Sequence, residues 1–157
     1  MKKLALAIIV LVVLGTVGCY AQKTKGNGNI ITKEIQIADY SGLIVGQGIE
    51  INGSFFSGKN KSPQVNYTQQ NGKSGLKITI DENLLPLLKF KIESGILKIE
   101  TEKGTRIIPS RLTIEAHSTE LKKLGVSSSI DFILKSSLSG DNIEINASGA
   151  SDVYLEK

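Results

Sequence analysis

The sequence predicts an all-β domain, and three observations support that fold class. Short runs of four to eight residues alternate aliphatic with polar side chains, as at 76–80 and 112–116. Clusters of Gly, Asn, Asp and Ser, which favour turns, separate these runs. Only one short stretch has a helical pattern. Because alternation with a period of two puts one set of side chains on each face of a strand, each run is expected to bury its aliphatic side.

The first residues have the pattern of an export signal. Lys2 and Lys3 precede an unbroken apolar run at 4–14, and small residues follow it. That run is shorter than the ~20 apolar residues that a membrane-spanning helix needs. An exported protein is therefore expected.

Two ways of removing this signal remain open. Small residues at Cys19 and Ala21 predict cleavage after residue 21, so that the signal covers 1–21. The order Thr-Val-Gly-Cys at 16–19 is instead a loose lipobox, in which Cys19 would carry a lipid and the signal would cover 1–18.

The remaining elements follow in order along the chain. Residues 22–29 are polar and glycine-rich, and we expect a flexible tether there, ahead of a domain at 30–157. The stretch near 82–88 follows Asp81, a typical helix cap, but Pro86 limits it to one short helical turn. The expected strands cover residues 31–37, 43–45, 49–51, 76–80, 97–99, 112–116, 143–145 and 153–155.

One pattern is repeated. Residues 43–51 form an aliphatic strand, a corner of small residues and a second strand, and residues 124–132 and 143–155 have the same form. The last two copies start about 20 residues apart, which is the length of one coil of a β-solenoid. Similar hairpins in an ordinary β-sandwich would give the same pattern, so periodicity alone leaves both folds open.

Five segments, in this order, resemble the putative auto-transporter adhesin head GIN domain family, a group of exported and often lipid-anchored proteins from Bacteroidota. They are Gly-Asn-Gly-Asn at 26–29, the strand-corner-strand run at 43–51, Asp-Glu-Asn-Leu-Leu-Pro at 81–86, Leu-x-Val-Ser-x-Ser at 124–129 and Ala-Ser-Gly-Ala-Ser-Asp at 147–152. The run at 81–86 is the most specific of them.

The resemblance implies a single-stranded right-handed β-helix over 30–157, and it implies no established catalytic or ligand-binding residue. Family members usually continue for several more coils, so the domain is expected to be truncated at its C-terminal end relative to the family. A strand edge left open there could pair with another chain or with a second copy.

Composition removes several classes of function. Cys19 is the only cysteine, so the exported part has no disulfide, zinc-thiolate site or cysteine nucleophile. The formal charge of +4 becomes about +2 without Lys2 and Lys3, and the basic residues are scattered among acidic ones. A nucleic-acid partner is therefore not expected.

No catalytic, cofactor or metal site is predicted. His117, the sole histidine, is expected to point outward at a strand end, and no Gly-x-Ser-x-Gly motif accompanies it. Glu50, Asp131, Glu144 and Asp152 could stack into an acidic column, but outward residues of a solenoid are polar in any case.

Three aromatic residues are candidate ligand contacts. Phe55 and Phe56 lie in a Gly- and Ser-rich connection, and with Tyr67 they could form a platform on which sugars stack. The alternative is that these side chains belong to the core or cover an edge.

The expected function is a non-enzymatic, adhesin-like module of the periplasm, outer membrane or cell surface. It would bind a glycan or a surface protein without a cofactor, and only a lipid on Cys19 would join it to a membrane. A polysaccharide lyase or hydrolase, or a structural envelope lipoprotein, remains the alternative. A cleft with two carboxylates within about 10 Å of each other and a nearby Lys or Arg would favour the enzyme.

Overall fold

The computed structural model describes residues 22–50, 62–140 and 142–156, which form thirteen strands and one short helical turn. The strands are β1 (Gln22–Lys25), β2 (Ile30–Ile35), β3 (Gly42–Val45), β4 (Gln64–Gln69), β5 (Gly75–Asp81), β6 (Leu88–Glu93), β7 (Ile96–Thr101), β8 (Thr105–Ile108), β9 (Leu112–Ser118), β10 (Lys123–Val126), β11 (Asp131–Leu134), β12 (Glu144–Ala147) and β13 (Val153–Leu155). The helical turn, η2, covers Leu85–Leu87. None of the described residues lies in a helix with the length and hydrophobicity that crossing a membrane requires.

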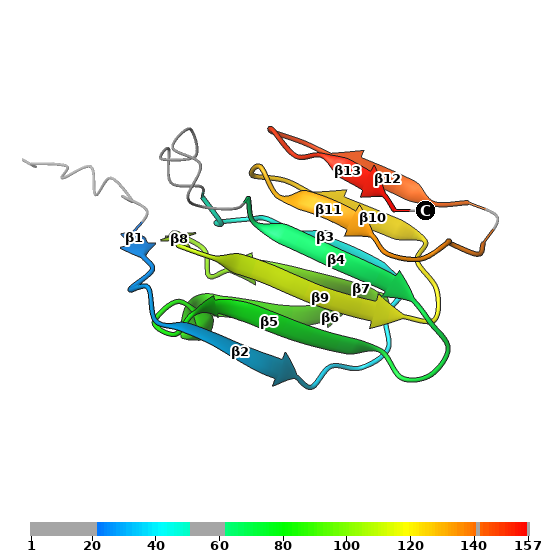
Figure 1. Ribbon diagram of the computed structural model, residues 1–157, viewed down its shortest axis with the longest axis horizontal. Coiled ribbons are helices and arrows are strands. Elements are labelled where there is room, and N and C mark those ends of the chain that lie inside the picture. Colours follow the sequence, from blue (N-terminus) through cyan, green and yellow to red (C-terminus); the bar gives the residue numbers. More distant parts are fainter. Residues whose placement is uncertain (1–21, 51–61, 141, 157) are drawn as a thin grey trace, which may run out of the picture.

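Two large sheets form the two layers seen in Figure 1. One has the order β13-β11-β4-β9-β5-β2 and the other the order β12-β10-β3-β7-β6. Most strands alternate buried with exposed side chains, as the sequence predicts for β5, β7 and β9. The buried side chains of both sheets join one core, in which Leu43 and Leu97 come from one sheet and Val65 and Ile114 from the other. The sheets therefore pack face to face, as in a sandwich.

The repeated segments of the sequence lie side by side as parallel strands. Leu43 in β3 pairs with Leu124 in β10, and Leu124 pairs with Ile145 in β12. In the other sheet β4, β11 and β13 stack in the same way. The sequence repeat therefore marks strand-corner-strand units that stack on one another.

The strand pairings differ from those of the right-handed β-helix expected for residues 30–157. A β-helix has parallel neighbours throughout, whereas β5 pairs antiparallel with both β2 and β9, and β6 pairs antiparallel with β7. The all-β class is confirmed, and the arrangement fits the sandwich alternative. The single helical turn expected near 82–88 is present as η2, with Pro86 inside it.

The segment expected to be a tether, residues 22–29, lies against the domain. β1 pairs in parallel with β8. The side chain of Asn83 donates to the carbonyl oxygen of Lys25 (2.9 Å) and accepts from the N–H of Asn27 (3.0 Å).

The side chain of Asp81 also binds the segment 22–29. Its carboxylate is fully buried and accepts hydrogen bonds from the N–H of Gly28 (2.8 Å) and from the N–H and hydroxyl of Ser110 (2.8 and 2.6 Å). A side chain at Gly26 would overlap the carboxylate, because its Cβ would lie 2.3 Å from the carboxyl atoms. The two sequence segments 26–29 and 81–86 thus contact each other directly.

The corners that follow β3 and β10 require residues with positive φ angles. Gly48 has φ +81°, and a Cβ there would lie 1.8 Å from Oγ1 of Thr101. Ser128 and Ser129 both adopt left-handed conformations, with φ of 65° and 60°. The Ser128 hydroxyl donates to the carbonyl oxygen of Gly46 (3.0 Å), so the two corners are joined.

Charged side chains pair with opposite charges, mostly on neighbouring strands. Glu50 contacts both Lys23 and Arg106. Further pairs are Lys77–Glu115, Lys91–Glu100, Lys98–Glu93, Lys123–Glu144 and Lys135–Glu156.

Strands β12 and β13 end the two sheets on the same side of the molecule (Figure 1). All four side chains of β12 are exposed. Ile145 and Tyr154 are each 49% exposed and Leu155 is 71% exposed, so apolar surface remains uncovered at this edge.

Candidate functional site

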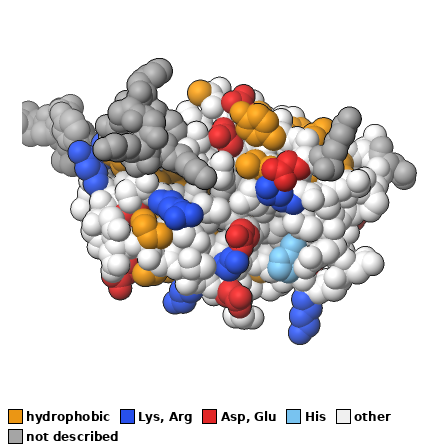
Figure 2. All heavy atoms as spheres, in the orientation of Figure 1, with side chains coloured by type: hydrophobic (Ala, Val, Ile, Leu, Met, Phe, Trp, Pro, Cys, Tyr) orange, Lys and Arg blue, Asp and Glu red, His pale blue; other side chains and the backbone are white. Residues whose placement is uncertain are grey.

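Polar side chains cover the outer face of the six-stranded sheet, which faces the viewer in Figure 2. Because paired residues on neighbouring strands point to the same side of a sheet, they form rows across it. One row contains Glu34, Lys77, Glu115, Asn66, Ile133 and Tyr154. A second row contains Thr32, Thr79, Thr113, Gln64 and Asp131.

Two hollows interrupt this face. The larger is a groove of about 670 Å³ lined by residues 34–39 and 73–77, together with Glu115 and His117. The smaller, of about 310 Å³, is lined on β4 by Asn66 and Thr68, and Glu115 and His117 line it too. The two hollows therefore meet at Glu115 and His117.

His117 lies over Gly75. The two residues are paired between β9 and β5, and a Cβ on Gly75 would lie 2.2 Å from Cε1 of the imidazole. The ring thus occupies space that a side chain at position 75 would fill. Only glycine at this position lets the imidazole lie close to the sheet, between the two hollows.

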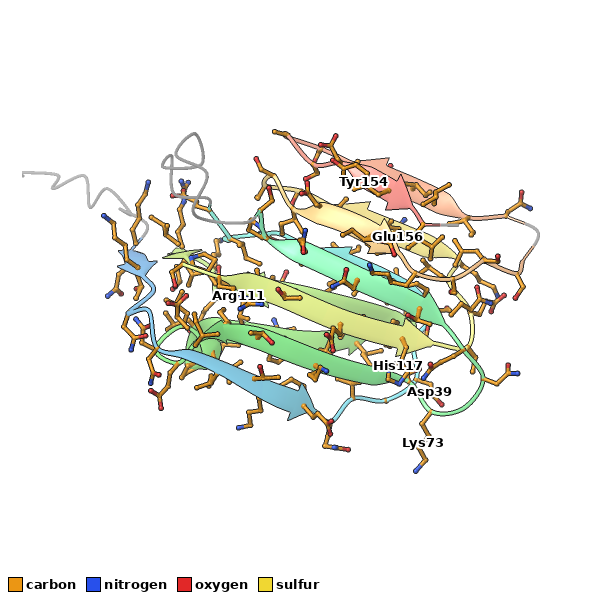
Figure 3. The ribbon with its side chains drawn as sticks, viewed as in Figure 1. Asp39, Lys73, Arg111, His117, Tyr154 and Glu156 are labelled. Carbon is orange, nitrogen blue, oxygen red and sulfur yellow. The ribbon has the colours of Figure 1, made fainter. Side chains whose placement is uncertain are left out.

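Asp39 forms one end of the larger groove, and Figure 3 shows it close to His117 and Lys73. Its Oδ1 accepts a hydrogen bond from the N–H of Ser74 (3.0 Å). That bond, the Ser74 hydroxyl and the charge of Lys73 hold the pKa of Asp39 below its usual range. Asp39 is therefore an ionised acceptor at neutral pH.

A row of charges lines the other side of the groove. Glu34, Lys77 and Glu115 are neighbours on β2, β5 and β9, and the ammonium of Lys77 contacts the carboxylate of Glu115. This hydrogen bond is the main reason why the pKa of Lys77 is raised, with the charges of Glu115 and Glu34 adding to it. The half-buried Ile35 and Ile37 add apolar surface to the same groove.

Neutral polar groups and the charged side chains of Glu115 and Lys135 line the smaller hollow. Thr68 pairs with His117 across β4 and β9, and Asn66 pairs with Glu115. Gln70 and Lys135 complete the lining, and Lys135 Nζ lies 2.7 Å from Oε1 of Glu156.

The acidic column considered from the sequence does not form. Glu50 is bound by Lys23 and Arg106, and Glu144 by Lys123 on the other sheet. Burial and the charge of Asp152 raise the pKa of Asp131, although a hydrogen bond from Ser62 opposes this. Within residues 22–50, 62–140 and 142–156, no three His, Cys, Asp or Glu side chains gather to hold a metal ion.

The larger groove offers hydrogen-bond acceptors and donors of several kinds. Asp39, Glu34 and Glu115 supply carboxylates, Lys73 and Lys77 supply ammonium groups, and His117 supplies an imidazole. Groups that accept hydrogen bonds and groups that donate them therefore lie along one groove.

The residues that the sequence singled out lie in different environments. Tyr67 is fully buried: its ring stacks on Phe132, and its hydroxyl bonds to Ser118 Oγ (2.7 Å), so it belongs to the core and offers no surface to a ligand. His117 points outward and is partly exposed. Phe55, Phe56 and Cys19 lie outside the described residues.

Sequence reasoning did not find Asp39, Lys73 and Gly75. These residues come from connections and a strand start, where side-chain alternation gives no signal. They meet His117 only because β5 pairs with β9 and because Ser74 binds Asp39, 35 residues away.

Known proteins resemble the chain in sequence and in fold. A putative adhesin from Parabacteroides merdae is 29% identical over 81% of this chain and 47% of its own, with a TM-score of 0.64. A putative lipid binding protein from Parabacteroides distasonis is 31% identical over 84% of this chain and 51% of its own (TM-score 0.68). A putative adhesin from the same organism is 27% identical over 87% and 51%, respectively (TM-score 0.71).

The chain spans about half the length of these solved structures. No curated protein matches it. Residues 59–156, more than half of the chain, match the model of one family, and the same family is indicated by the segments at 26–29 and 81–86 that contact each other through Asp81 and Asn83. The protein belongs to the family described as putative auto-transporter adhesin, head GIN domain.

Proposed function

We propose that this protein is an exported, adhesin-like binding module without catalytic activity, and that it holds its ligand on the outer face of the six-stranded sheet. One observation carries the proposal: two hollows on that polar face meet at Glu115 and His117. A concave site with a few converging polar groups is the usual form of a ligand-binding site.

The names of the relatives support the same class of function. Two of the similar structures are described as putative adhesins and one as a putative lipid binding protein. A glycan, a surface protein and a lipid are therefore the ligands to test, and the polar rows of the face favour the glycan.

Export and attachment are part of the proposal. The apolar run at 4–14 supports export, and a lipid on Cys19 would hold the module at a membrane surface. Mass spectrometry of the mature N-terminus distinguishes a protein that begins with lipidated Cys19 from one that begins at Gln22.

We also propose that the stacked units of β3–β4, β10–β11 and β12–β13 form a short β-solenoid within the domain. Their parallel register and joined corners support this. The antiparallel strands β2, β5 and β6 would then close one end of it.

The test is binding of the purified protein to arrays of glycans, surface proteins and lipid vesicles. Thr68→Arg fills the smaller hollow with a long side chain and should reduce capture of the ligand at least tenfold. Lys91→Ala, on β6 of the other sheet, should leave capture unchanged. Absence of any ligand, or equal capture by Thr68→Arg, would refute the proposal.

A glycan-cleaving enzyme is the second candidate, favoured by the three carboxylates and two lysines in the larger groove. Incubation with polysaccharides should then release new chain ends, and Glu115→Gln should stop the release. On the binding proposal no chain ends appear with any substrate.

A further inference from the structure

We propose that the end of the larger groove formed by Asp39, Lys73, Gly75 and His117 is a subsite for one uncharged sugar ring of a glycan. This inference rests on the proposed function, because it names the chemical class of the ligand for the same face. A carboxylate and an imidazole lie close together there, and the side chain of Lys73 extends outward from the same end of the groove (Figure 3).

The donor and acceptor pattern fits a sugar. A carboxylate only accepts hydrogen bonds, an ammonium only donates them, and a neutral imidazole does both. Each sugar hydroxyl both donates and accepts, so a pair of neighbouring hydroxyls can donate to Asp39 and accept from Lys73. Hydrogen bonds to charged groups are also the stronger kind.

The charges select against an anionic ligand. At this end Asp39 balances Lys73, and farther along the groove Glu115 is bound to Lys77. The remaining charge that lines the groove is the carboxylate of Glu34. A uronic acid or a phosphate would need an excess of positive charge, which the described lining does not have.

The groups are held in place before a ligand arrives. The N–H of Ser74 holds Oδ1 of Asp39 in place. The imidazole of His117 rests where a side chain at Gly75 would be. Fixed partners reduce the entropy that binding costs.

The smaller hollow extends the binding surface beyond the larger groove. It begins on the other side of His117 and offers the amide of Asn66 and the hydroxyl of Thr68. From β5 across β9 to β4 the distance is about 10 Å, since neighbouring strands lie about 4.8 Å apart. A glycan chain can therefore cross the strands from one hollow to the other.

The test compares neutral oligosaccharides with uronic acid oligosaccharides and phosphatidylglycerol vesicles by calorimetric titration. We expect binding of a neutral oligosaccharide, lowered about tenfold by Asp39→Asn and by His117→Ala and unchanged in Lys91→Ala. Gly75→Ala, which displaces the imidazole, should weaken binding as well. Far-UV circular dichroism shows whether each variant is folded.

Nuclear magnetic resonance gives a second readout that does not depend on a variant. The chain has one histidine, so its ring signals belong to His117. They should shift when the neutral oligosaccharide binds.

The outcomes separate the subsite from the proposed function. One outcome would overturn the subsite but keep the binding face. In it, Thr68→Arg abolishes binding, whereas Asp39→Asn and His117→Ala leave the affinity unchanged and the ring signals do not shift. Binding of uronic acids or vesicles alone would overturn the choice of a neutral sugar. If no ligand of any class binds, both proposals fail.

Discussion

A buried carboxylate, Asp81, is one of the groups that join the N-terminal segment to the rest of the domain. Burial alone would raise its pKa, but hydrogen bonds from the Ser110 hydroxyl and from the N–H groups of Gly28, Ser110 and Arg111 outweigh that effect and hold the pKa below its usual range. A carboxyl with a lowered pKa stabilises the fold in its ionised form. Asp81 therefore contributes stability above the pKa of the unfolded chain, and this contribution is lost as the pH falls through the folded pKa.

We expect Asp81→Ala to lower the free energy of unfolding by roughly 3 kcal/mol or more at pH 7, because buried N–H groups lose a charged acceptor. Urea denaturation measures the change. The difference from wild type should shrink as the pH falls below about 4. Glu82→Ala, whose side chain binds Asn29 at the surface, is the matched control and should cost under about 1 kcal/mol. Equal stability of Asp81→Ala and wild type at pH 7 would contradict this account.

Gly48 and Gly104 have nearly the same backbone, with φ of +81° and +83°, but different surroundings. A Cβ at Gly48 would overlap Thr101 Oγ1, while nothing lies within 4 Å of one at Gly104. Gly104→Ala should cost about 1 kcal/mol for its backbone alone. Gly48→Ala should cost about 2 kcal/mol more, because side-chain overlap adds to the same backbone penalty. Thermal denaturation of the two variants tests this, and equal losses would show that the corner can relax.

The strands differ in how far the sequence could predict them. β5, β7 and β9 alternate cleanly, and the sequence places them correctly. β4 was missed, because Val65 and Tyr67 are its only apolar residues among polar ones. Periodicity also cannot show that the β3–β4 unit lies between the β7–β9 and β10–β11 units, because this order depends on pairing between distant parts of the chain.

The candidate site was predictable only in part. Alternation along β9 correctly puts Glu115 and His117 on the outer face. The hollow around them depends on Asp39, which is bound by Ser74, and on the bare backbone of Gly75. Tyr67 is the opposite case: it was expected to join an aromatic platform for a ligand, yet its side chain points into the core.

We propose that β12 and β13, the last described strands of the two sheets, pair with a second copy, since Ile145, Tyr154 and Leu155 are exposed on them and beside them. Sedimentation velocity should show association that increases with protein concentration. Leu155→Lys should weaken it, whereas Ile30→Lys, on the β2 edge of the same sheet, should not. A wild-type protein that stays monomeric at every concentration would rule out this contact.

The two ends of the sheets are built differently across the whole molecule. One end has the antiparallel strands β2 and β6 with η2 nearby, and the other ends in the short parallel strands β12 and β13 (Figure 1). The larger hollow lies nearer the first end, on β2, β5 and β9. The smaller hollow includes Lys135, which is bound to Glu156 just after β13, so its shape is linked to the second end.

The paired charges on the strands also determine how a partner would approach. Each carboxylate beside a lysine or arginine cancels most of its neighbour's potential within a few ångströms, so these pairs add little to the long-range field. Where such pairs surround the site, a ligand would arrive by plain diffusion, at a rate that salt hardly changes. Strength of attachment would come from slow release or from many modules acting together on one surface.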